Sequence, residues 1–290
     1  MQASLIAILS LLGISWGMWF QVREIWNAWM GDGLRSIGLL IPVASIALLL
    51  RAWRKSKPAM HGTWHGLVLC VLALAAARFD GSRPWILRLP SGIVFHPLFL
   101  GLLLFIFVSG AILLFAGAEA WRRGLFPLAL LLCVNPVPQA FNHAVDLPLQ
   151  YIGAHTANCF ASWLNLPMDR SELRLMFAPT LGMFIAPGCN GLRGAVGMGY
   201  LAMIVGYVYA LPGRLWAAFT ASGVLLAYLL NLIRLCVLVL CYKLALSAPF
   251  LARHMEAADY ALGSLLFLSA AMTLLTVPRQ WRQVRTPNLS

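Results

Sequence analysis

The stretch Leu215–Leu246, LWAAFTASGVLLAYLLNLIRLCVLVLCYKLAL, decides the fold class of this chain. It is longer than the roughly 20 apolar residues that a membrane-spanning helix needs. Its leucines and alanines show none of the two-residue alternation of a barrel strand. A helix that starts at Arg214 climbs about 30 Å, the thickness of the hydrocarbon layer, by Arg234. The stretch therefore predicts a spanning helix with Arg234 at the far membrane interface.

The composition of the whole chain is that of a membrane protein. Of its 290 residues, 61% are hydrophobic and 10% are charged, against about 25% charged in soluble domains. The net charge of +12 comes from basic residues in short segments between apolar runs, where membrane topology explains them. We therefore predict a polytopic helical membrane protein with no nucleic-acid partner.

The remaining apolar runs predict an all-α bundle of about eight transmembrane helices in a single domain, residues 1–290. The predicted spans are 3–21, 37–52, 64–79, 97–118, 125–134, 189–210, 215–246 and 257–276. The segment Asp146–Leu166 mixes apolar and polar residues, which predicts an interfacial helix or a loop before the sixth span.

Two basic clusters set the predicted orientation. The cluster at 51–57 follows the second span, and Arg122 and Arg123 follow the fourth. Both are predicted to be cytoplasmic, because cytoplasmic loops of membrane proteins are rich in lysine and arginine. With eight spans, three positions then lie at the outer face. They are the start of the sixth span, the position of Arg234 in the seventh span and the start of the eighth span.

The sixth span opens with Ala186–Arg193, APGCNGLR. Pro187 and Gly188 suit the turn before a helix, so Cys189 is predicted at or near a helix N-terminus. The free backbone N–H groups and the helix dipole lower a thiol pKa there, and Arg193 adds a positive charge one turn later. The stretch predicts either a reactive thiolate or a small core residue.

The other cysteines predict neither a metal site nor a disulfide framework, and we expect no cofactor. None forms a CxxC pair or a ligand-like cluster with histidine. They are Cys70, Cys133, Cys159, Cys236 and Cys241. Cys159 differs from most of them, since it lies outside the predicted spans.

In the predicted topology Cys189, Arg234 and His254 converge at the outer face. Each has a plain structural interpretation: Arg234 can cap a helix or extend to the interface, and His254 can be an ordinary interfacial residue. An arginine within an apolar run costs several kcal/mol, however, which favours a function or a buried partner. Together the three supply a nucleophile, a base and an oxyanion stabiliser.

In these residues the chain resembles the exosortase and archaeosortase family of membrane-embedded, sortase-like cysteine transpeptidases. The resemblance covers residues 125–276. Cys189–Arg193, CNGLR, matches the Cys-small/polar-Gly-Leu/Ile-Arg motif of the family, Asn231–Arg234, NLIR, matches Asn-x-x-Arg, and His254 precedes the last span. Asn190 stands where many members have serine, which bears on the subfamily and on the tripeptide it recognises.

The resemblance implies a thiol protease and transpeptidase of the cell inner membrane, associated with exopolysaccharide, with its active site on the periplasmic face. Its partners are expected to be exported proteins with a C-terminal sorting signal: a short motif, a membrane helix and a basic tail. Cys189 is the implied nucleophile, Arg234 the oxyanion stabiliser and His254 the general acid and base. The thioester is expected to pass to an amine-bearing acceptor or to water. Residues implied to bind substrate or support the site are Arg193, Asn190 and Asn231.

Two other functions remain open at this point. A non-catalytic transporter or polysaccharide-assembly component would use Arg193 and Arg234 to bind an anionic lipid-linked substrate. A membrane acyltransferase would use His254. Arg193 itself either holds Cys189 ionised or pairs with a carboxylate such as Asp146.

Overall fold

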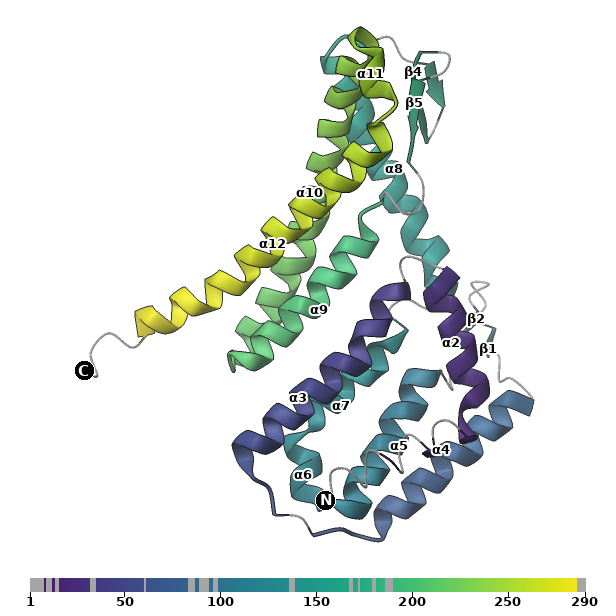
Figure 1. The fold of residues 1–290 in the computed structure, drawn as a ribbon, viewed down its shortest axis with the longest axis vertical. Helices are drawn as coiled ribbons and strands as arrows, with labels where there is room; N and C mark the ends of the chain where they lie inside the picture. The colour runs from purple at the N-terminus through teal and green to yellow at the C-terminus, as the bar shows by residue number, and fades with distance from the viewer. Residues whose placement is uncertain are drawn as a thin grey trace. The chain divides into compact units, whose positions relative to one another are not determined.

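The computed structural model describes residues 8, 12–13, 16–31, 35–59, 61–82, 87–88, 94–95, 99–135, 139–166, 169–171, 173–178, 181–185 and 190–285. Most of these residues are helical, and the predicted all-α membrane class is confirmed. The chain divides into two compact units: unit 1 is Met1–Asn142 and unit 2 is His143–Ser290 (Figure 1).

Four helices in the described part of the chain are long and apolar enough to cross a membrane. They are Ser36–Ser56, His65–Ser82, Gly213–Ser247 and Met255–Pro278, and Leu100–Phe115, Leu125–Val134 and Leu192–Val208 are shorter apolar helices. At most 28% of each long helix's apolar window is buried in the protein, so most of that surface is free to contact lipid. The first predicted span, 3–21, lies largely outside the described residues, and the count of eight spans stays a prediction.

Unit 1 is a set of short and medium helices with one two-stranded antiparallel sheet. Its elements are α2 (Trp19–Gly31), η1 (Arg35–Leu39), α3 (Leu40–Ser56), α4 (His65–Ser82), β1 (Leu87–Arg88), β2 (Val94–Phe95), α5 (Leu100–Phe115), α6 (Gly117–Arg123), α7 (Leu125–Leu130) and η2 (Leu131–Val134). α2 continues to Gly31, beyond the predicted end of the first span at Gln21. One core of the unit is formed by Met18, Ala73, Ala77, Leu103 and Phe107.

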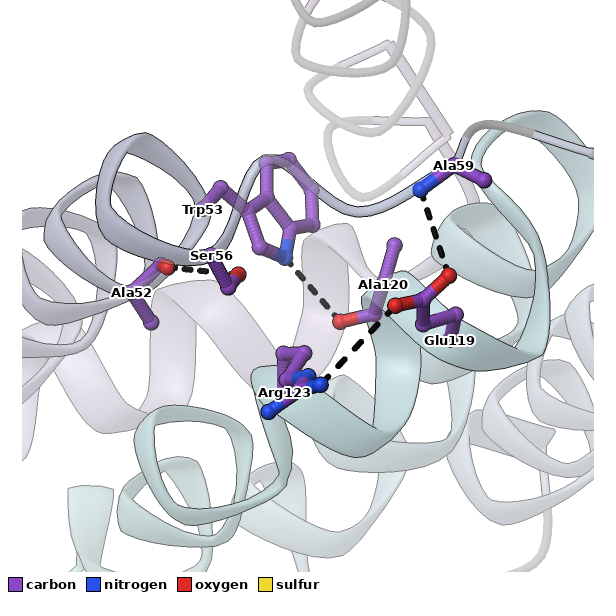
Figure 2. Close-up of polar contacts among 7 residues, drawn as sticks. All are labelled: Ala52, Trp53, Ser56, Ala59, Glu119, Ala120 and Arg123. Atoms are coloured by element: carbon purple, nitrogen blue, oxygen red, sulfur yellow. Dashed lines mark hydrogen bonds and ion pairs between the residues drawn. The ribbon is translucent and has the colours of Figure 1, made fainter.

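The two basic clusters lie at the same end of unit 1, where α3 ends against α6 (Figure 2). Trp53 Nε1 donates a hydrogen bond to the Ala120 carbonyl oxygen at 3.0 Å, and the Ala59 N–H donates to Glu119 Oε2 at 3.3 Å. These contacts hold the 51–57 segment beside the α6 helix that carries the second cluster. The predicted topology requires this arrangement, and the side of the membrane stays a prediction.

Unit 2 contains three long helices and a small sheet. Its elements are α8 (Gln139–Trp163), which begins at the end of unit 1, β3 (Asp169–Ser171), β4 (Arg174–Ala178), β5 (Leu181–Phe184), α9 (Leu192–Val208), α10 (Gly213–Ser247), α11 (Pro249–Ala252) and α12 (Met255–Arg285). Of the two alternatives for the Asp146–Leu166 segment, a helix is therefore the correct one through Trp163. The antiparallel sheet of order β3-β4-β5 is a finding that the apolar pattern did not predict.

α10 is one continuous helix of 35 residues, so its length, at 1.5 Å per residue, is well above the roughly 30 Å hydrocarbon thickness. Its second half packs against α8 and the sheet, while α9 and α12 flank its first half (Figure 1). The core around the second half consists of Leu235, Leu238 and Val239 with Ala154, Ala157, Ala161, Leu175, Phe177, Met183 and Ile185. The long apolar run is therefore a spanning segment followed by a helical support for the α8 and sheet layer.

Candidate functional site

The chain enters α9 through Gly191, which lies directly against α10. Gly191 has a φ of +82°, a left-handed conformation that glycine adopts without a steric penalty. A Cβ atom at this position would lie 2.8 Å from Nδ2 and 2.9 Å from Cγ of Asn231. Only a glycine therefore fits here, and its close approach joins the motif that begins at Cys189 to the motif that ends at Arg234.

Asn190 fixes the same turn from the other side. It is 2% exposed. Its Oδ1 accepts a hydrogen bond from the Leu192 N–H at 2.9 Å, the local bond by which asparagine stabilises a turn two residues on. Its Nδ2 donates to Asp146 Oδ1 at 2.5 Å. The start of α9 is thereby tied to α8 as well as to α10.

Arg234 has a half-buried partner, Asp259, on the last long helix. Its Nε donates to Asp259 Oδ1 at 2.7 Å, and its Nη2 lies 2.5 Å from the same oxygen. Its Nη1 donates to Asn231 Oδ1 at 3.4 Å. The Arg234 side chain is only 17% exposed, so the guanidinium is held between α10 and α12 and does not extend freely to the membrane interface.

The Arg234 guanidinium keeps hydrogen-bonding capacity for a ligand. A guanidinium carries five N–H donors, and the contacts to Asp259 and Asn231 engage three of them. At least two donors are left for an oxygen atom. Because Asp259 offsets the positive charge, the arrangement suits a carbonyl oxygen that acquires charge during a reaction better than a permanent anion.

His254 lies in the turn between α11 and α12 and is exposed. Its Nδ1 is 3.1 Å from the Phe250 carbonyl oxygen, and the two rings lie 4.8 Å apart. Since a carbonyl can only accept, this contact puts the hydrogen on Nδ1 and leaves Nε2 as the basic atom of the neutral ring. Within the described residues no hydrogen bond joins His254 to Arg234, although Asp259, the partner of Arg234, follows His254 by only five residues.

Two further residues of the predicted site have less defined surroundings. Cys189 lies outside the described residues, so its predicted helix N-terminus and its role stay predictions. Arg193 is exposed on the first turn of α9. Asp146, one of its expected partners, accepts a hydrogen bond from Asn190. Among the described residues no group of three or more histidines, cysteines, aspartates or glutamates could hold a metal ion.

Asp259 belongs to the site but is missed by motif reasoning. One signal pointed to such a residue, because a buried arginine in an apolar run requires a counter-ion. The first turns of the last span offer Glu256 and Asp259. Which of the two carboxylates pairs with Arg234 depends on how α12 packs on α10. The two helices are close at Gly263, where a Cβ atom would lie 3.5 Å from Arg234 Nε.

Comparison with known proteins gives one family. The sequence matches the family of transmembrane exosortases over residues 26–282, which includes every site residue described above. No curated protein and no solved structure matches the chain.

Proposed function

The chain belongs to the transmembrane exosortase family, and from this premise we propose that it is a cysteine peptidase and transpeptidase that removes C-terminal sorting signals from exported proteins. One observation carries the proposal beyond the family: Gly191, two residues after Cys189, lies against Asn231, which in turn contacts Arg234. A nucleophile and an oxyanion stabiliser need this proximity.

The proposed reaction begins at Cys189. Nε2 of His254 takes the proton of the Cys189 thiol. The resulting thiolate sulfur forms a bond to the scissile carbonyl carbon, and the carbonyl π pair moves to the oxygen. The free N–H donors of Arg234 stabilise that oxyanion. When the intermediate collapses, the C–N bond breaks and His254 supplies the proton to the departing amine. The products of this step are a thioester on Cys189 and the released C-terminal membrane helix.

In the second half of the proposed reaction an amine-bearing acceptor, or water, attacks the thioester carbonyl. Nε2 of His254 takes the proton of the attacking group, and the C–S bond breaks to restore the Cys189 thiolate. The length of α10 supports a site at a membrane interface, because Arg234 lies about 30 Å above the start of this helix. We place that interface on the periplasmic side of the cell inner membrane.

The pairing of Arg234 with Asp259 also weighs against the transporter alternative. An anionic lipid-linked substrate is best held by arginines whose charge is not neutralised, whereas Arg234 has a carboxylate at 2.5 Å. A neutral peptide carbonyl competes with no such partner, because it uses the donors that Asp259 leaves open.

Co-expression with a candidate substrate tests the proposal. The substrate is an exported protein from the same genome that ends in a short motif, an apolar helix and arginines. We expect wild-type protein to remove the C-terminal helix, Cys189→Ala to remove none of it, and Cys189→Ser to be nearly inactive because a serine hydroxyl is not ionised at neutral pH. The mass of the recovered substrate reports the outcome.

Cys159 offers a matched control for this experiment. Its thiol is exposed on α8 and lies 3.5 Å from His155 Nε2, so it is a second thiol beside an imidazole. Cys159→Ala is expected to process the substrate at the wild-type rate. Normal processing by Cys189→Ala would end the peptidase proposal and return the protein to the transporter class.

A further inference from the structure

Gln150 is a buried residue whose side-chain amide has no hydrogen-bond partner among the described residues. It lies on α8 and is 4% exposed, yet no hydrogen bond of its side chain occurs in the part of the chain that the structure describes. Gln21 of unit 1 is buried to the same extent and donates to the Ala77 carbonyl oxygen at 2.7 Å. The side-chain amide of Gln150 therefore keeps hydrogen-bonding capacity that none of the described residues uses.

The position of Gln150 on α8 points toward the candidate site. Asp146, four residues earlier, and Gly153, three residues later, share its face of the helix. Asp146 is bonded to Asn190, the residue directly after Cys189. A Cβ on Gly153 would lie 3.1 Å from Leu235 Cδ1. Gln150 therefore lies between the contact with the start of α9 and the contact with α10.

The two chain segments that flank Cys189 meet this same face. Ile185, which is fully buried, has its Cγ2 atom 3.9 Å from the Cβ position on Gly153, and Asn190 lies at Asp146. On α10 the facing residue Leu235 is one turn beyond Asn231. Gln150 is thus placed between the approach to Cys189 and the helix that carries Arg234.

We propose that Gln150 is a further catalytic residue, whose side-chain N–H donates a hydrogen bond to the scissile carbonyl oxygen as the Cys189 sulfur attacks the carbonyl carbon. This inference rests on the proposed function, because it requires Cys189 as the nucleophile. The amide adds a neutral donor to those that Arg234 leaves open. Since it has no partner among the described residues to give up, it is ready for the oxyanion without rearrangement, which is the condition for strong transition-state stabilisation.

Two reagents that attack the same thiol test this role without a known substrate. p-Nitrophenyl acetate acylates a thiolate through a tetrahedral oxyanion and releases coloured p-nitrophenolate. Iodoacetamide alkylates the thiolate by displacing iodide and forms no oxyanion. Both rates are measured on the full-length protein in proteoliposomes, and the rates of Cys189→Ala are subtracted to remove the other thiols.

Gln150→Met keeps the side-chain volume and removes the donor. We expect its acylation rate to fall by about 10²-fold, the loss typical for one oxyanion donor, while alkylation stays within about twofold of wild type. Gln150→Asn keeps an amide with a shorter reach, and we expect it to recover part of the acylation rate. Equal acylation rates in wild type and Gln150→Met would overturn the inference, as would an equal slowing of both reactions.

Gln21→Met is the matched control, because it makes the same change at a buried glutamine of unit 1. Both of its rates are expected to equal those of wild type. The outcome also separates the two proposals. If substrate cleavage requires Cys189 but Gln150→Met is acylated normally, only the role of Gln150 fails; if cleavage does not require Cys189, the proposed function fails first.

Discussion

The buried polar side chains of unit 1 and unit 2 have different kinds of partner. In unit 1 two of them donate to backbone carbonyls: Gln21 donates to Ala77 at 2.7 Å, and Ser45 donates to Pro127 at 2.6 Å. A backbone carbonyl is already fixed by its helix, so such a bond joins one helix to another. The polar groups of unit 1 therefore serve helix packing.

In unit 2 a group of buried and half-buried polar side chains bind one another. Asn190 donates to Asp146, and Arg234 donates to Asp259 and Asn231. Bonds between side chains orient functional groups as well as helices, and a site that must hold reacting atoms needs this orientation. The difference indicates that unit 2 carries the chemistry and that unit 1 has a supporting role, which the following variants test.

His254 differs from these side chains of unit 2, because it is exposed and its bond is to the backbone carbonyl of Phe250. If it is the general acid and base, His254→Ala should lower the cleavage rate by about 10²–10⁴-fold and flatten the pH dependence near neutrality. Cleavage rates across a pH series measure this. A purely structural histidine would leave the pH profile unchanged.

Arg234→Lys tests the planar geometry of the guanidinium. A lysine keeps the charge but cannot bind Asp259 and Asn231 and also present two donors to an oxygen. We expect a fall of about 10²-fold in the cleavage rate, with normal amounts of protein in the membrane. An unchanged rate would mean that Arg234 is only a structural cation.

Asp259→Asn tests whether side-chain pairing positions Arg234. The guanidinium stays but loses its charged partner, so we expect roughly tenfold slower cleavage and partial recovery in Asp259→Glu. Combining Asp259→Asn with Arg234→Lys should cost less than the sum of the single changes in activation free energy, because both disrupt one unit. Additive effects would show that the pair does not act together.

Trp53→Phe makes the corresponding change in unit 1, where Trp53 Nε1 donates to the Ala120 carbonyl oxygen. Losing this bond should lower the stability by about 1 kcal/mol and leave the cleavage rate of the folded protein unchanged. Thermal unfolding in detergent and the cleavage assay measure the two effects. A selective loss of activity would break the distinction between the units.

Part of this architecture could be predicted from the sequence, because apolar length and helix punctuation are local signals. They gave the membrane class and the apolar helix that contains Arg234. The sheet was missed because its strands have only three to five residues, too few to show an alternating pattern. Asp259 and Gln150 were missed as site residues because their roles depend on how helices distant in sequence pack, and no local pattern records this.

The most direct measurement is the identification of the covalent intermediate. Wild-type protein is mixed with the sorting-signal substrate, quenched in acid and digested, and the peptides are examined by mass spectrometry. The account predicts a substrate fragment attached to Cys189 through a thioester that hydroxylamine removes. Loss of the substrate's C-terminal helix with the fragment on another residue, such as Cys159, or with Cys189 unmodified in every quenched sample, would contradict it.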